Sequence, residues 1–125
     1  MQQLLLVCIG GAAGSGARHL VGVWAAKSLP SPLPLSTLLV NVLGSALLGV
    51  LWALLASRGP EAAGWRALLM TGVCGGFTTY STFNLESLQL LEAGKVGHFV
   101  LYLGATILIC LVAGAIAAAL ARLMI

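Results

Sequence analysis

Residues 72–84 read GVCGGFTTYSTFN, a run of glycines and hydroxyl-bearing side chains. Apolar sequence flanks this run on both sides, from Trp65 to Met70 and from Leu85 to Leu91. Inside a bilayer a helix hides its own backbone polar groups, and broken backbone is tolerated only where it faces protein, water or an ion. The run therefore predicts a helix that opens at membrane depth, with the functional site in the opening.

The composition of the whole chain is that of a membrane protein. Of its 125 residues, 60% are hydrophobic and 7% are charged, whereas soluble domains carry about 25% charged residues. The charged side chains are scattered and form no basic run, so we expect no nucleic-acid partner. The three cysteines lie in apolar stretches without metal-ligand spacing. No Ser/His/Asp or Cys/His set is recognisable, and we expect no enzyme.

Four apolar stretches each exceed the roughly 20 residues that cross a hydrocarbon core. They cover residues 4–26, 35–56, 65–91 and 96–124. We therefore predict an all-α membrane protein with four transmembrane helices, the third of them broken, forming a single domain over residues 1–125. Glycines at GxxxG spacing offer close helix-packing faces: Gly10 with Gly14, and Gly72 with Gly76.

Cations are balanced between the two sides of this topology. Three lie on the side of the termini and three on the other: Arg58, Arg66 and Arg122 against Arg18, Lys27 and Lys95. The positive-inside rule then gives no orientation, and insertion both ways up would produce an inverted pair of the kind that many transporters build within one chain. Small four-span proteins with balanced charge also occur in one orientation, so charge alone leaves both topologies open.

The second stretch carries a candidate polar site. The amide of Asn41 offers two N–H donors and one acceptor. Thr37 lies one turn earlier on the same helix face, and Ser45 lies one turn later. This stripe predicts donors directed at an anion. For Asn41 taken alone, an interhelical hydrogen bond is the alternative.

The interrupted stretch carries a second candidate site. Gly75 and Gly76 permit backbone conformations that other residues resist, and unwound carbonyls there suit a hard cation such as Na⁺. The helix that restarts would direct its N–H groups at the break, which suits an anion. Tyr80 and Phe83 lie on one face, where their electropositive ring edges can face an anion or simply pack. Hydroxyls are abundant here: Thr78, Thr79, Ser81 and Thr82.

Several further polar residues each allow two interpretations. One face of the fourth stretch is either a weakly polar track or a packing stripe: Tyr102, Thr106, Cys110 and Gly114. Arg18 either snorkels to the interface or raises the anion concentration at a pore mouth. Glu86 needs a partner at its depth and either gates the pathway or joins helix ends. His19 and His98 lie near span ends and are expected to be interfacial.

Three motifs are distinctive: GGAAGSGARHL (10–20), STLLVNVLGSALLG (36–49) and GVCGGFTTYSTFNLE (72–86). With them the chain resembles the Fluc (CrcB) family of fluoride ion channels, and the resemblance covers essentially the whole chain. It implies an antiparallel, dual-topology homodimer in the lipid of the cell inner (plasma) membrane. Two pores would conduct fluoride passively, and one structural Na⁺ would be buried at the centre of the dimer.

The resemblance also implies roles for individual residues. Backbone carbonyls of Gly75 and Thr78 from both subunits would hold the Na⁺. Together with the hydroxyls singled out above, the predicted anion pathway is Asn41, Tyr80, Phe83, Ser81, Thr82, Thr37, Thr106 and Arg18. The sequence departs from the usual family pattern at a few positions: Tyr80 replaces a phenylalanine, Cys110 and Gly114 replace hydroxyls, and His19 stands where an aromatic is common.

Two other functions are alternatives. A small proton-coupled multidrug exporter also has four spans and often dual topology, but it needs a carboxylate in the middle of a span, whereas Glu86 lies late in the third. A helix-packing subunit without transport activity would explain the small residues. It would not explain a helix break combined with Asn41.

Overall fold

The computed structural model describes residues 1–125, and all of its regular secondary structure is helical. Helices α1 (Gln2–Ser28), α2 (Leu35–Leu55) and α6 (Val96–Arg122) are each long and apolar enough to cross a membrane. The predicted all-α membrane protein is thereby confirmed. Their bounds lie within about two residues of the apolar stretches expected from the sequence.

The chain between α2 and α6 is divided into several short helical pieces. They are η1 (Pro60–Ala62), α3 (Ala63–Trp65), η2 (Arg66–Cys74), α4 (Gly75–Phe77) and α5 (Tyr80–Glu92). The piece η2 is a π-helix of nine residues, although π-helices are rare and occur mostly as single turns. No feature of the sequence had indicated it. Between α4 and α5, Thr78 and Thr79 have extended backbone.

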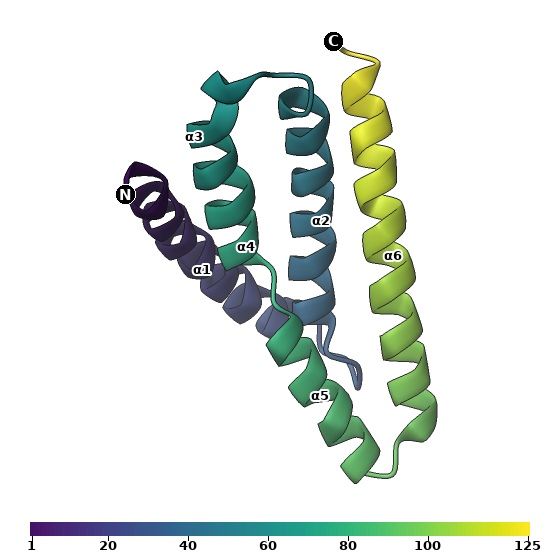
Figure 1. The fold of residues 1–125 in the computed structure, drawn as a ribbon. Coiled ribbons are helices and arrows are strands. Elements are labelled where there is room, and N and C mark those ends of the chain that lie inside the picture. Colours follow the sequence, from purple (N-terminus) through teal and green to yellow (C-terminus); the bar gives the residue numbers. More distant parts are fainter.

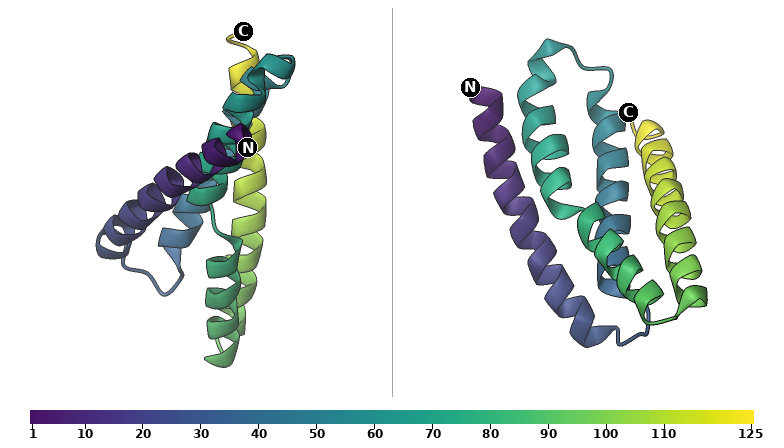
Figure 2. Two further views of the ribbon diagram at one scale, coloured as in Figure 1. Left: turned by 60° about the vertical axis from the view of Figure 1, so that its left-hand side comes forward. Right: turned by 60° about the horizontal axis from the view of Figure 1, so that its bottom comes forward.

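The helices form an open, splayed bundle with both chain termini at one end (Figure 1). Helix α2 packs along α6, and α1 packs along η2 and α4. After the extended residues the chain changes direction, and α5 runs beside the first half of α6 (Figure 2). Because the extended residues face α2, the break lies inside the bundle rather than at its edge.

A seam of glycines joins α1 to η2 and α4. A Cβ added at Gly10 or Gly14 would overlap a backbone carbonyl oxygen, of Leu68 or Val73 respectively, and one added at Gly76 would overlap the backbone of Gly11. Only residues without a side chain allow this backbone approach. The predicted packing role of the GxxxG pairs is confirmed, and we call this contact the glycine seam.

The connections at the two ends of the bundle are fixed by specific contacts. A guanidinium N–H of Arg66 donates to the carbonyl oxygens of Leu55, at 2.6 Å, and Arg58, which ties the C-terminus of α2 to η2. At the other end Gly94 has a φ of +70°, a conformation that favours glycine, and turns the chain from α5 into α6.

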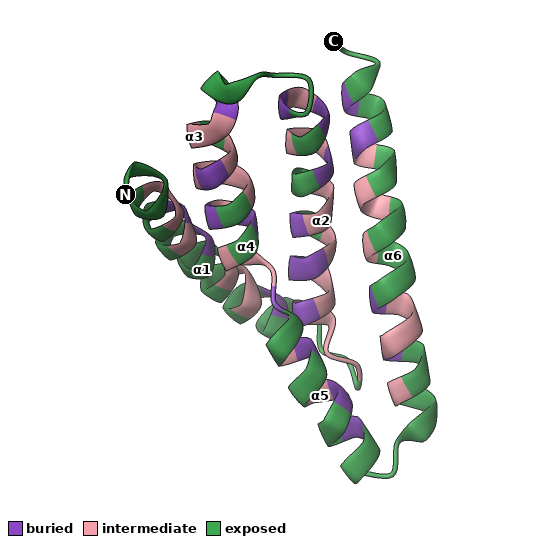
Figure 3. Ribbon diagram, viewed as in Figure 1, coloured by how far each residue is buried: buried purple, intermediate pink, exposed green.

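Most of the surface is apolar and exposed. Only 22 of 125 residues are buried in the single chain, and the outer faces of α1 and α6 are exposed along most of their length (Figure 3). The buried side chains form small clusters, one around Phe83, Leu90 and Tyr102. Such a surface is stable in lipid rather than in water, so the chain is a multi-pass membrane protein.

Candidate functional site

The site is organised by the two extended residues between α4 and α5. Thr79 has φ −148° and ψ 115°, and its side chain accepts a hydrogen bond from the N–H of Thr82 at 3.2 Å. Threonine is a favoured residue at the N-terminal cap of a helix because its hydroxyl satisfies an otherwise unpaired N–H. Thr79 is therefore the N-terminal cap of α5, and its own backbone is extended.

The break separates the backbone carbonyls of Gly75 and Thr78 from their helical partners. In a continuous helix the N–H of Thr79 would bond to the carbonyl of Gly75, and the N–H of Thr82 would bond to that of Thr78. Instead, Thr79 donates to Oδ1 of Asn41 at 2.8 Å, and Thr82 donates to the hydroxyl of Thr79. The carbonyl oxygens of Gly75 and Thr78 therefore lack the donors that an unbroken helix supplies.

The two glycines before the break are helical, which differs from the sequence-based expectation that the backbone opens there. Gly75 has φ −63° and ψ −38°, and the opening follows three residues later. Gly76 is required by its close packing on Gly11, whereas a Cβ at Gly75 would meet no atom within 4 Å. The break lies at Thr78 and Thr79 because Asn41 and the threonine hydroxyl take the amides that would continue the helix.

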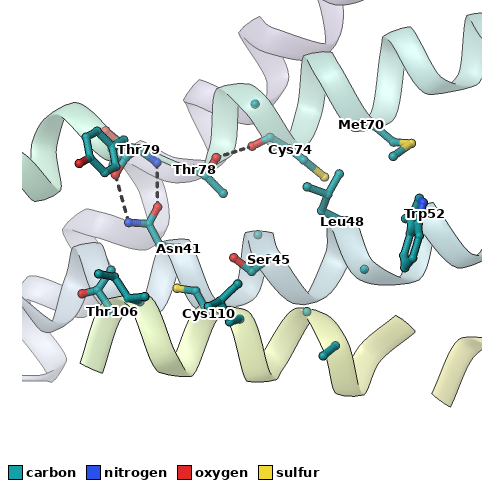
Figure 4. A pocket seen from close by; sticks show the side chains of 18 of the residues that line it. Asn41, Ser45, Leu48, Trp52, Met70, Cys74, Thr78, Thr79, Thr106 and Cys110 are labelled. Atoms are coloured by element: carbon teal, nitrogen blue, oxygen red, sulfur yellow. Dashed lines mark hydrogen bonds between the residues drawn. The ribbon is translucent and has the colours of Figure 1, made fainter. Parts of the chain in front are cut away.

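Asn41 holds the break from α2. Its Nδ2 donates to the carbonyl of Thr79 at 3.0 Å while its Oδ1 accepts from the N–H of the same residue (Figure 4). Asn41 is buried, so these bonds form away from water. The interhelical bond that the sequence left as an alternative is present, and the amide retains a second N–H beyond the one given to Thr79.

A cavity of about 740 Å³ lies between α2, the break and α6. Four of the predicted pathway residues line it: Asn41, Tyr80, Phe83 and Thr106. Thr106 is only 7% exposed, and its hydroxyl has no hydrogen-bond partner within the protein. An unpartnered buried hydroxyl is unfavourable by about 1–3 kcal/mol, so the hydroxyl of Thr106 would be stabilised by a further polar partner. We call this space the large cavity.

Three aromatic rings lead from the large cavity into the protein. The rings of Tyr80 and Phe83 are 5.6 Å apart and tilted by 56°, and those of Phe83 and Tyr102 are 5.2 Å apart and tilted by 54°. Tyr80 is 78% exposed, whereas Phe83 is 4% exposed and Tyr102 is fully buried. Tilted pairs present ring edges as well as faces, so the row offers electropositive edges beside the cavity.

Glu86 joins three helices through its carboxylate. The hydroxyl of Thr37 on α2 donates to Oε1 at 2.8 Å, and the hydroxyl of Tyr102 on α6 donates to Oε2 at 2.7 Å. The expectation that Glu86 needs a partner is confirmed, and it has two. Tyr102 was not among the predicted site residues, and its shared helix face with Thr106 was the only signal for it.

A smaller cavity of about 380 Å³ lies between α1, α2 and α5, and only one of its lining residues is hydrophobic. It receives the predicted Arg18, Thr37 and Thr82, together with His19 and Glu86. We call it the polar cavity. Thr79 lines both cavities, so the break stands between them.

The remaining sequence-predicted residues fall at the margins of these spaces. Ser81 lines neither cavity, but its hydroxyl lies 3.4 Å from that of Thr79. On α6 both interpretations of the polar face apply: Thr106 and Cys110 line the large cavity, while Gly114 also packs against Ser45 and Gly49 of α2. Thr79 was predicted only as one of the hydroxyls of the interrupted stretch and not as a pathway residue, although a threonine at a helix start is a capping signal.

The fold and the site define a multi-pass helical membrane protein whose interrupted segment separates a polar cavity from an apolar one. Comparison with known proteins identifies the family to which the chain belongs. The family model described as "CrcB-like protein, Camphor Resistance (CrcB)" matches residues 5–121, and the chain belongs to this family.

Relatives with similar sequences span nearly the whole chain and carry one name. A protein of Anaeromyxobacter sp. (strain K) named "Fluoride-specific ion channel FluC" is 50% identical over 98% of this chain and 97% of its own length. Proteins of the same name from Agrobacterium fabrum and Caulobacter vibrioides (strain NA1000 / CB15N) are 42% and 43% identical, each over 90% of both chains. These relatives are named as ion channels, not as enzymes.

Proposed function

We propose that this chain is a fluoride-specific channel that lets F⁻ leave the cytoplasm passively across the cell inner membrane. The observation that carries the proposal is the break at Thr78 and Thr79, held by Asn41 between a polar and an apolar cavity. The relatives named as fluoride channels supply the identity of the ion.

The chemistry of the site suits a small, strongly hydrated anion. Removing water from F⁻ is expensive unless other donors replace it. Along the proposed route these donors would be the second N–H of Asn41, the hydroxyl of Thr106 and the ring edges of Tyr80 and Phe83. None of these groups carries a full charge, so binding stays weak enough for the ion to leave again.

Passive conduction is sufficient for export. In acid surroundings fluoride enters a cell as neutral HF and dissociates inside, where the anion is trapped. A channel that passes F⁻ alone is electrogenic, and the negative interior of the cell then drives the anion out without a coupled ion.

A second copy in the opposite orientation would complete the site. In one chain the large cavity is open to the surface, Gly75 faces empty space, and the ring of Tyr80 is 78% exposed. The balanced cations described above permit insertion both ways up. We therefore propose an antiparallel homodimer with two pores, in which the pieces from α3 to α5 together act as a broken third membrane span.

The same break offers ligands for a structural Na⁺. Hard cations prefer oxygen ligands, and the carbonyl oxygens of Gly75 and Thr78 lack their helical donors. A Cβ at Gly75 would meet no other atom, so its backbone can be approached closely. The residues therefore fit a cation held by two carbonyls from each copy, which would fix the two breaks to one another.

The geometry gives no support to the alternative of a proton-coupled exporter. Such a protein needs a carboxylate that takes up and releases a proton in the substrate cavity. Glu86 has both oxygens bonded to hydroxyls and does not line the large cavity.

Fluoride efflux from liposomes tests the channel directly. Purified protein reconstituted with internal fluoride should release it rapidly once a potassium ionophore provides the counter-current, as read by a fluoride electrode. Phe83→Ile should abolish efflux while the dimer still forms. Phe99→Ile, a substitution in the same packed cluster but outside the large cavity, should retain it. No efflux with the wild type would refute the proposal.

Two further measurements test the assembly. Replacing Na⁺ by an organic cation during purification should lower the melting temperature of the dimer, and restoring Na⁺ should recover it, because a ligand stabilises the state that binds it. Two reporters can be fused in turn to the C-terminus, one active only in the cytoplasm and the other active only outside it. In a dual-topology protein both fusions should be active. If a single reporter is active, the dual topology is wrong, although the channel itself is not.

A further inference from the structure

The polar cavity contains two basic side chains next to each other in the sequence. Arg18 and His19 on α1 both line it, opposite hydroxyl-bearing residues of α2 and α5. Glu86 on α5 also lines it, but its two oxygens accept bonds from Thr37 and Tyr102 rather than from either basic residue. The cavity therefore holds two basic side chains, neither of which is bonded to the carboxylate of Glu86.

Two charged groups line this cavity together with His19. They are the guanidinium of Arg18 on its own helix and the carboxylate of Glu86 on α5. Helix α2 contributes only the uncharged Ser36, Thr37 and Val40. No residue of α6 lines the cavity, but the hydroxyl of Tyr102 on α6 donates a hydrogen bond to Glu86. With Arg18 and Glu86 balancing each other, the net charge of the cavity depends on whether the imidazole carries a proton.

We propose that His19 is an additional anion-binding residue of the polar cavity, and that it captures fluoride more strongly in acid. The inference rests on the proposed channel function. Histidine is the side chain that ordinarily changes charge between pH 5 and 8. A positive charge in a lined cleft raises the local concentration of anions and their rate of arrival.

The consequence is a channel whose capture of fluoride increases at a mouth that is exposed to acid. Acid drives HF into the cell, and the same acid adds a positive charge at whichever mouth is exposed to it. In an antiparallel dimer one copy of His19 would face each side of the membrane. An effect on capture is largest when fluoride is dilute and arrival limits conduction, and it decreases with ionic strength because salt screens the charge.

Electrical recording separates this effect from the leak of HF, because a neutral acid carries no current. The wild-type protein in planar bilayers, with the same pH on both sides, should show a fluoride conductance about two- to fivefold higher at pH 5.5 than at pH 7.5 at low fluoride concentration. The increase should shrink when an impermeant salt is added.

Variants of the two histidines assign the effect. His19→Gln should lose the increase in acid, and His19→Lys should show a high conductance at both pH values. His98→Gln is the matched control, because His98 is the other histidine, lies exposed at the start of α6 and does not line the polar cavity. It should keep both the neutral-pH conductance and the increase.

Each opposite result is informative. A wild-type conductance that is equal at pH 5.5 and 7.5, or an increase that persists in His19→Gln, would overturn this inference while leaving the channel intact. A wild type that carries no fluoride current at any pH would overturn the channel function, and the inference with it.

Discussion

The glycine seam and the large cavity both contain glycines, yet the seam is closely packed within a single chain, whereas the large cavity is open at the surface of that chain. Along the seam, the backbone of α1 touches that of η2 and α4, and an added methyl group has no room at Gly10, Gly14 or Gly76. Around the large cavity Gly75 faces open space and Thr106 has a buried hydroxyl without a partner.

This difference separates residues that stabilise the fold by close packing from residues that have no contact partner within the chain. Backbone packed on backbone stabilises a membrane protein without any ligand. An unpartnered polar group at membrane depth is instead a mark of function. Glycine therefore has opposite meanings at Gly14 and Gly75, although the two look equivalent in the sequence. The substitutions below test this distinction, beginning with the largest expected effect.

Adding a single methyl group to the glycine seam should destabilise the fold. Gly14→Ala places a Cβ against the carbonyl of Val73 and near the N–H of Phe77, and we expect a loss of about 3 kcal/mol, since backbone cannot move aside as a side chain can. Gly16→Ala on the same helix meets no atom within 4 Å and should be neutral. Melting temperature and the yield of monodisperse protein in detergent measure both. Equal melting of the two variants would contradict the assigned role of the seam.

The break should lose its anchor when Asn41 is truncated. Asn41→Ala leaves the buried N–H and carbonyl of Thr79 without partners, which should destabilise the fold by about 2 kcal/mol and abolish fluoride efflux. Asn84→Ala, an exposed position on α5, serves as the control and should change neither property. Efflux that survives in Asn41→Ala would show that the break does not need this bond.

The large cavity should respond in function rather than in stability. Thr106→Val keeps the shape of the side chain and removes the hydroxyl that has no partner, so the melting temperature should stay the same or rise. Efflux should fall about tenfold if the hydroxyl donates to the anion, the size expected for one hydrogen bond to a charged group. Thr71→Val, at an exposed position on η2, should leave efflux unchanged. A similar efflux from the two variants would place Thr106 outside the pathway.

The smallest effect is expected at the far end of the large cavity. The guanidinium carbon of Arg122 lies 4.4 Å from the ring centroid of Trp52, which lines that end. Arg122→Gln should lower stability by about 0.5–1 kcal/mol with no change in efflux, as judged by thermal melting and the electrode assay. Arg58→Gln is the comparison, and a larger loss there would contradict the importance of the stacked pair.

The sequence predicts the outline of this molecule better than its interior. The lengths of the apolar stretches predict α1, α2 and α6, because an apolar helix that is long enough can span the hydrocarbon core of a bilayer. The sequence predicts that the backbone opens at Gly75 and Gly76, whereas the extended residues of the structure are Thr78 and Thr79. Glycine permits an opening without forcing one, and what forces it is the amide of Asn41, 38 residues away from Thr79.

The interior contacts were missed for the same reason. The carboxylate of Glu86 meets Thr37 across 49 residues and Tyr102 across 16, and neither pairing follows a helical period. The π-helical stretch from Arg66 to Cys74 is likewise absent from any local pattern. Residue types indicated which side chains were chemically important, whereas tertiary packing determined which of them meet.

The pair of hydrogen bonds between Asn41 and Thr79 has a consequence for the motion of the break. The backbone N–H and C=O of Thr79 are both bonded to the buried side-chain amide of Asn41, so this extended residue has its two backbone hydrogen bonds satisfied as a helical residue does. Hydrogen–deuterium exchange at the Thr79 amide should accordingly be slow, like that of a helix interior and unlike that of a loop. A non-helical stretch inside a membrane protein can thus be as well ordered as a helix.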